Sequence, residues 1–192
     1  AVKVTEESKA VRIDTGVLTC VIPLGGDNLI ESLSVDGREV SRNGRLVGIL
    51  QEGPATEPED APSRVKFAGR VSKGTGDHNG PVCAWGRLEG VHHVASSGRD
   101  WLPFVVRLYF YSGQTAVRMV HTVIFDGDQE KDFVRGLGIQ FDVPLRDEPR
   151  SRYVRFAGAK GGVWSEPLQP GGGNVEQEAG QPFTPRRGFE EN

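Results

Sequence analysis

The side chains most suited to chemistry alternate with apolar ones along three segments rich in β-branched and aromatic residues. Such alternation is typical of a strand with one buried and one outward face. If these segments are neighbouring strands, one sheet face presents two aromatic rings, three arginines, two carboxylates and an amide. These candidate ligand-binding residues are Trp85, Arg87, Glu89, Arg107, Tyr109, Arg118, Gln140 and Asp142.

A face of this composition suits a sugar. Flat aromatic rings cover the C–H faces of a pyranose, and arginines and carboxylates form paired hydrogen bonds with hydroxyls or carboxylates. The alternative is a solvated sheet face, on which cross-strand Tyr–Arg pairs stabilise the sheet by a few tenths to about 1 kcal/mol each. The sequence leaves both interpretations open.

A hairpin sets the register of this face. If Gly113 and Gln114 form a two-residue turn, the numbers of opposing residues sum to 227, so Phe110 faces Val117 and Leu108 faces Met119. The face that holds these apolar residues is then the core. A three-residue turn would shift the register by one and break this pairing.

Other ionisable residues carry weaker signals. His92 and His93 are adjacent in a predicted strand, so they point to opposite faces and cannot bind one ion together. His121 falls among core positions, either as a buried structural histidine or as a catalytic base. The acidic segment Asp126–Asp132 lacks the glycine and glutamate of a calcium loop, and an acidic hairpin turn is the better interpretation.

Familiar catalytic motifs are missing from the sequence. It contains no GxSxG elbow, phosphate-binding loop, HExxH pair or dinucleotide fingerprint. A retaining glycosidase needs two carboxylates about 5 Å apart, and Glu89 and Asp142 are the candidate pair. We therefore assign no catalytic residue, metal ligand or cofactor, and the question of enzymatic activity stays open.

The elements predicted to position these residues are strands. Runs of β-branched and aromatic residues are separated by Gly, Asp and Asn, without helical periodicity between them. This spacing favours an all-β, antiparallel sandwich or barrel over βαβ units. Of the two, we expect an antiparallel, supersandwich-like β-sandwich. The predicted strands are Val11–Ile13, Val17–Ile22, Leu29–Val35, Leu46–Gln51, Arg64–Ser72, Val82–Val91, Phe104–Tyr111, Thr115–Phe125, Val134–Val143, Tyr153–Phe156 and Gly162–Trp164.

Composition shifts divide the chain into four parts. Residues 1–51 hold the N-terminal strands of the sandwich, and residues 52–63 form an acidic, proline-rich loop. Residues 64–168 form the main sandwich. Residues 169–192 are rich in glycine and proline and are predicted to be an extended tail.

The composition excludes several classes of partner. The 192 residues carry a net charge of −3, with a pI of about 5.9, which disfavours a general binder of nucleic acid or anionic membranes. No apolar run approaches the roughly 20 residues that span a bilayer. Cys20 and Cys83 form no CxxC motif. They are predicted to be either one disulfide or two buried free thiols.

Two stretches, residues 11–40 and 79–145, resemble the β region of the exo-acting rhamnogalacturonan lyase-like proteins, a polysaccharide lyase family. The resemblance as a whole covers roughly 100 to 150 residues of the chain. The matching motifs are DTG at Asp14–Gly16, the GPV…EG strand at Gly80–Gly90, the YxGQ hairpin at Tyr111–Gln114, HTxIFDGDQEKDF at His121–Phe133 and RGLGIxFDVPL at Arg135–Leu145.

The resemblance implies a larger architecture than this chain contains. Such proteins join an N-terminal β domain and a central β-sandwich to a helical toroid, and they eliminate across rhamnose–galacturonate linkages of pectin. Elimination needs a base for the proton α to the carboxylate and cations that neutralise that carboxylate. Because this chain ends near the sandwich, no catalytic residue is carried over. Cys83–Gly86 also depart from a plainer β-branched strand.

Three hypotheses follow. The first is a non-catalytic β-sandwich module that contacts acidic, uronate-containing polysaccharide through Arg107, Tyr109 and Arg118, located outside the cell or at its surface. The second is an inactive fragment of a lyase. The third is a structural assembly subunit, in which residues 169–192 connect copies into a homo-oligomer or filament.

Overall fold

The computed structural model describes residues 1–54, 62–157 and 162–168. These residues form β-strands and one 3-10 turn and contain no α-helix, which confirms the all-β, antiparallel prediction. The chain divides into two compact units, Ala1–Pro144 and Leu145–Asn192. Most of the predicted acidic loop and the whole predicted tail lie outside the described residues.

The first unit is built on one antiparallel sheet in which β1 to β9 are hydrogen-bonded in sequence order and β10 pairs with β5. The strands are β1 (Lys3–Glu6), β2 (Ala10–Asp14), β3 (Leu18–Pro23), β4 (Ile30–Val35), β5 (Arg38–Glu52), β6 (Arg64–Asn79), β7 (Cys83–Val94), β8 (Arg99–Tyr111), β9 (Val117–Val123) and β10 (Asp132–Asp142). The two longest strands, β5 and β6, are joined by the acidic loop.

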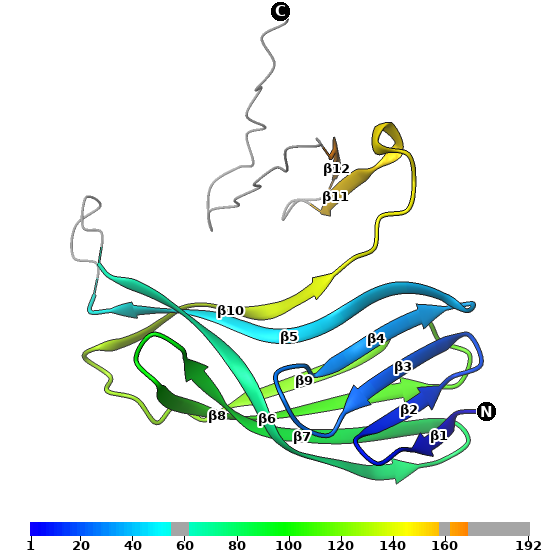
Figure 1. Cartoon of the computed structure of the whole chain (residues 1–192), viewed down its shortest axis with the longest axis horizontal. Helices are drawn as coiled ribbons and strands as arrows, with labels where there is room; N and C mark the ends of the chain where they lie inside the picture. The colour runs from blue at the N-terminus through cyan, green and yellow to red at the C-terminus, as the bar shows by residue number, and fades with distance from the viewer. Residues whose placement is uncertain (55–61, 158–161, 169–192) are drawn as a thin grey trace, which may run out of the picture. The chain divides into compact units, whose positions relative to one another are not determined.

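This sheet folds over on itself, so that its two halves bury a common core (Figure 1). The first residues of β6 pair with the end of β5, and the rest of β6 pairs with β7, so β6 runs from one layer to the other. The core draws on both halves: Ile13, Cys20 and Leu46 from β2, β3 and β5 pack in one cluster with Leu88 and Phe104 from β7 and β8.

The hairpin β8–β9 has the register expected from its turn. Phe110 lies opposite Val117 and Leu108 opposite Met119, as the sum rule predicts. On β8 the predicted core face is confirmed, because Phe104, Leu108 and Phe110 are buried. On β9 it is less complete, and Met119 keeps 37% of its surface exposed. The reason is that β9 is an edge strand with β8 as its neighbour in the sheet.

Three of the motifs that carry the family resemblance meet in space. The amide of Gly113 donates to the carbonyl of Thr15 (2.8 Å), and the Thr15 hydroxyl donates to the carbonyl of Gln114 (2.9 Å). The amide of Ser112 donates to the carbonyl of Val82 (2.9 Å). Thr15 is only 1% exposed. The DTG, GPV and YxGQ motifs therefore hold three turns together, which is a structural role.

The second unit is described for residues 145–157 and 162–168. It contains the 3-10 turn η1 (Pro149–Ser151) and the antiparallel pair β11 (Tyr153–Ala157) and β12 (Val163–Pro167). The two strands agree with the segments expected from the sequence. The amide of Leu168 donates to the carbonyl of Arg152 (2.9 Å), which extends the pairing by one step.

Close packing of the sheet predicts that Gly90→Ala destabilises the protein. A Cβ at this position would lie 2.0 Å from the backbone oxygen of Arg70 and 2.7 Å from the ring of Phe104, and backbone cannot move aside cheaply. We expect the free energy of unfolding in denaturant titrations to fall by at least about 2 kcal/mol.

The matched control is Gly138→Ala on β10, where a Cβ meets nothing within 4 Å. This variant should stay within about 0.5 kcal/mol of the wild type. Equal stability of the two variants would contradict the packing described for β7.

Candidate functional site

Five of the eight predicted site residues come together on the outer face of β7, β8 and β9, which are hydrogen-bonded neighbours, and the side chain of Trp85 lies outside the described part of the structure. We call this surface the arginine platform. In one row across the strands, Trp85, Tyr109 and Arg118 are register partners, and in the next row Arg87, Arg107 and Val120 are partners. The platform consists of Arg87, Glu89, Arg107, Tyr109 and Arg118.

The charges of the platform are unevenly paired. Arg87 forms an ion pair with Glu89 (Nη2–Oε1 2.9 Å), and the Arg118 guanidinium lies 5.5 Å from the centre of the Tyr109 ring. Arg107 lies directly opposite Arg87 on the neighbouring strand. In the described part of the chain, Arg107 has no ion-pair partner. Two like charges thus face each other, and Glu89 neutralises one of them.

The structure does not bring Gln140 and Asp142 to this platform. Both lie on β10, which pairs with β5, where Gln140 faces Arg45 and Asp142 faces Arg42. The Asp142 carboxylate accepts a hydrogen bond from the Asn43 side chain (2.8 Å). We expected the strand that holds Gln140 and Asp142 to lie beside β7, β8 and β9. This expectation was wrong, because β10 pairs with β5 instead.

The same topology separates the two carboxylates considered for glycosidase chemistry. Glu89 lies on β7, whose partners are β6 and β8, and Asp142 lies on β10, beside β5. Glu89 is paired with Arg87, and Asp142 is engaged by Asn43. These two residues do not form a facing acid–nucleophile pair on adjacent strands.

The histidines divide between the two faces as the alternation predicts. His92 is buried, and its Nδ1–H donates to the carbonyl of Leu102 (2.7 Å). His93 lies on the outer face, with Nδ1 2.6 Å from a carboxylate oxygen of Asp100. His121 packs against His92 and Phe104, with ring centres 5.9 Å away in each case.

Burial makes the inner histidine pair hard to protonate. Desolvation lowers the pKa of His92 below its ordinary value, and desolvation together with the neighbouring His92 lowers the pKa of His121. The Nε2 atoms of both rings are buried, and neither has a hydrogen-bond partner among the described residues. His92 packs against Phe67 and Phe104, and His121 packs against Phe104, which fits the structural interpretation of His121.

A β-bulge holds this region together. Gly90 pairs with Phe104 and His92 with Trp101, so Leu102 and Pro103 on β8 oppose one residue on β7. Leu102 adopts a left-handed φ of 45°, which is strained for a non-glycine residue. Its carbonyl accepts from His92, and its amide donates to a carboxylate oxygen of Asp126 (2.7 Å).

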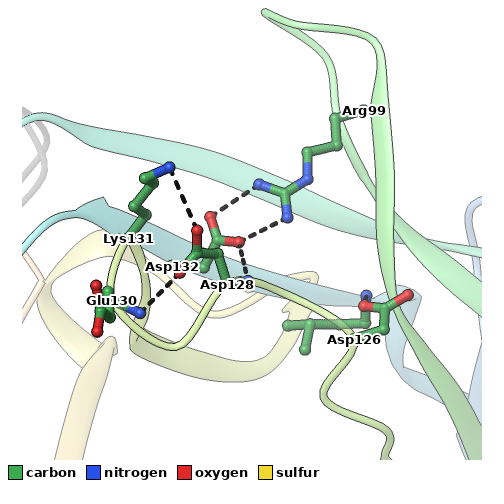
Figure 2. Close-up of polar contacts among 7 residues, drawn as sticks. Arg99, Asp126, Asp128, Glu130, Lys131 and Asp132 are labelled. Atoms are coloured by element: carbon green, nitrogen blue, oxygen red, sulfur yellow. Dashed lines mark hydrogen bonds and ion pairs between the residues drawn. The ribbon is translucent and has the colours of Figure 1, made fainter.

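The carboxylates of the acidic segment 126–132 form ion pairs with basic side chains of the same chain. Arg99 on β8 donates two hydrogen bonds to the Asp132 carboxylate (2.8 and 2.7 Å), and Lys131 pairs with Asp128 at 3.4 Å (Figure 2). The Asp128 amide also donates to Asp132 (2.8 Å). Figure 2 shows the Arg99 fork aimed at the Asp132 oxygens. The segment is a turn closed by ion pairs.

These contacts keep the acidic turn ionised. The hydrogen bonds from Arg99 hold the pKa of Asp132 below its usual range, and the backbone amide of Glu130 lowers the pKa of Asp128. Asp132 is only 8% exposed. Among the described residues, no group of three or more His, Cys, Asp or Glu side chains is arranged to hold a metal ion.

A second concave surface was missed by the sequence analysis. A groove of about 720 Å³ lies over β10, β5 and β6, and reaches the end of β7. We call it the β5 groove; its outward residues include Arg45, Val47, Ile49, Lys66, Ala68 and Gly138. The alternation of β5 and β6 could have indicated this outward set. The pairing of β10 with β5, which completes the groove, is not readable from local pattern.

Two further expectations are resolved. Cys20 and Cys83 are free thiols, and burial raises the pKa of Cys20 to about 12, so this thiol is inert at neutral pH. Within residues 1–54, 62–157 and 162–168, no helix is long and apolar enough to cross a membrane.

Comparison with known proteins identifies matches that cover most of the chain. The family model described as the PcRGLX-like protein central beta sandwich domain matches residues 2–181. This match confirms the resemblance to the β-sandwich region of rhamnogalacturonan lyase-like proteins. The uncharacterized protein YetA of Bacillus subtilis (strain 168) is 38% identical over 173 residues, which cover 88% of this chain. The same match covers 20% of YetA, so the chain spans about a fifth of that relative's length.

The Arg99–Asp132 pair predicts a stability test. Replacing Arg99 with alanine leaves the nearly buried Asp132 carboxylate without its main partner. We expect the free energy of unfolding at pH 7 to fall by roughly 2 to 3 kcal/mol in urea titrations. Because the folded pKa of Asp132 is depressed, this stabilisation is present above pH 3.8 and is lost as the pH falls through the folded pKa. Arg135→Ala, an exposed change on β10, is the control, and a similar loss in both variants would contradict the assignment.

The buried histidine pair predicts a second pH dependence. Both folded pKa values lie below 6.5, so the unfolded chain takes up protons first as the pH falls below 6.5. The unfolding free energy should therefore decrease from pH 6.5 downward until the folded histidines titrate. His121→Phe should reduce this decrease in melts at a series of pH values, whereas Thr122→Ser, a change of an exposed residue without a titrating group on the same strand, should not. An unchanged profile for His121→Phe would show that the pair does not titrate in this range.

Proposed function

The chain belongs to the family of PcRGLX-like central β-sandwich domains, and on this premise we propose that it is a non-catalytic module that contacts acidic, uronate-containing polysaccharide through the arginine platform. The observation that carries the proposal is the position of Arg107. It faces Arg87 across adjacent strands and has no ion-pair partner among the described residues. An extracellular or cell-surface location is part of the proposal.

The like-charge pair is a local cost that a ligand would remove. Like charges directly opposite each other on neighbouring strands are destabilising. A uronate carboxylate placed over Arg107 would offset this repulsion and could accept two parallel hydrogen bonds from the guanidinium fork. Glu89 already neutralises Arg87, so the free site is centred on Arg107.

The adjacent row supplies a surface for the sugar ring. Tyr109 lies in the row next to that of Arg107. The guanidinium of Arg118 lies 5.5 Å from the centre of the Tyr109 ring. An aromatic ring next to a cation can cover the C–H face of a sugar while the cation contacts its carboxylate. Both residue types occur within one hydrogen-bonded set of strands, so little reorganisation is needed on binding.

The overall charge restricts what the platform can do. A chain with a net charge of −3 does not attract polyanions in general, so attraction must come from a local cluster. The platform supplies such a cluster. Salt should therefore weaken binding, because exposed charge pairs are screened at high ionic strength.

The test is the double variant Arg107→Ala/Arg118→Ala. We expect retention on immobilised polygalacturonate to be lost, with the dissociation constant rising at least about tenfold, equivalent to about 1.4 kcal/mol. The melting temperature should stay within a few degrees of the wild type, since both side chains lie on the outer face.

The control is Arg12→Ala/Arg38→Ala, which removes the same charge from exposed positions on β2 and β5. Retention equal to the wild type in the platform variant would refute the proposed face. A loss of folding in the platform variant would assign these arginines a structural role instead.

A further inference from the structure

We propose that the β5 groove is a second binding site for an acidic oligosaccharide, with Arg45 and Lys66 holding carboxylates at two ends of an apolar floor. This inference rests on the proposed function, because it assigns the same class of ligand to a separate surface. The two surfaces share no residue, so each can be removed without the other.

The floor of the groove is a row of register partners across four strands, in which Gly138 and Ala68 are small. Gly138 on β10 faces Val47 on β5, Val47 faces Ala68 on β6, and Ala68 faces His93 on β7. A Cβ added at Gly138 would meet open space. Because the side chains at Gly138 and Ala68 are short, the backbone lies close to the surface here. A flat ring can therefore approach the sheet closely.

Cations flank this row on both sides along the strand direction. Lys66 is the register partner of Ile49, and Arg45 lies four residues before Ile49 on β5, next to Gln140 on β10. Four residues of an extended strand span about 13 Å. In the described part of the chain, neither Arg45 nor Lys66 forms an ion pair or side-chain hydrogen bond.

The margins of the groove carry polar groups that are already held in place. Arg70 forms an ion pair with Asp27 (Nε–Oδ1 3.7 Å), and His93 is held by Asp100 at 2.6 Å. These pairs leave Arg45 and Lys66 as the cations available to an anion from outside. A volume of about 720 Å³ is in the range of small-molecule sites.

This combination favours an acidic sugar chain over other occupants. An apolar partner would gain nothing from two unpaired cations, which it would have to desolvate at a cost. A compact anion such as phosphate could reach one cation but not two that lie about 13 Å apart along the strand. A short chain of uronate rings offers apolar C–H faces for the floor and carboxylates at separated positions for both cations.

The experiment compares Arg45→Ala/Lys66→Ala with the platform variant and with a control, Lys3→Ala/Arg38→Ala, which removes equal charge at exposed positions. The probe is a galacturonate oligomer, titrated by calorimetry and by amide NMR, with an uncharged oligosaccharide as the reference ligand. We expect the groove variant to lose at least about tenfold in affinity, and the amide resonances of Gly136 and Gly138 to shift in the wild type but not in this variant.

Each outcome is decisive for one of the two surfaces. Unchanged affinity and unshifted groove amides in the wild type would overturn the groove inference, whatever happens at the platform. Loss of binding in the groove variant with normal binding in the platform variant would support the groove and refute the platform. If the uncharged oligosaccharide shifts the same amides equally, the cations have no role and the inference is overturned.

Discussion

One continuous sheet supplies both walls of the sandwich, and this constraint decides where every side chain can go. Because β6 passes from one layer to the other, each strand gives one set of alternate residues to the shared core and keeps the other set outside. The fold depends on its turns being held in register, since a slip of one residue would exchange the two faces. The buried Thr15 serves this purpose: it bonds to Gly113 and Gln114 and ties the β2–β3 turn to the β8–β9 turn.

The strongest polar contacts of the described residues serve the fold. Leu102 occupies a strained left-handed conformation that persists because its amide is bound by Asp126 and its carbonyl by His92. The next turn along is closed by Arg99 and Asp132. In the segment that superficially resembles a calcium loop, the carboxylates therefore bind a backbone amide and cations of the same chain. These groups therefore have structural roles in the described part of the chain.

The sequence was sufficient for the local geometry and insufficient for the long-range pairing. The register of β8 and β9 follows from the two-residue turn at Gly113, and the opposite orientations of His92 and His93 follow from strand alternation alone. The position of Gln140 could not be predicted, because β10 crosses back to β5 and no local pattern records which strand it will join. For the same reason the β5 groove was missed: Val47, Ala68 and Gly138 are an ordinary outward set on each strand and become a floor when the three strands are aligned.

An acidic chain with local basic surfaces differs physically from a basic protein. A protein with a large positive charge binds any polyanion. A net charge of −3 opposes nonspecific association with polyanions, so attraction is confined to places where cations have no ion-pair partner among the described residues. Arg107 is such a place, because its partner across the strand is another arginine. Arg45 and Lys66 are another, separated by an apolar floor. Discrimination between polyanions would then depend on the spacing of their carboxylates and on their apolar faces. The spacing of the cations that would contact these carboxylates is fixed by the geometry of the strands.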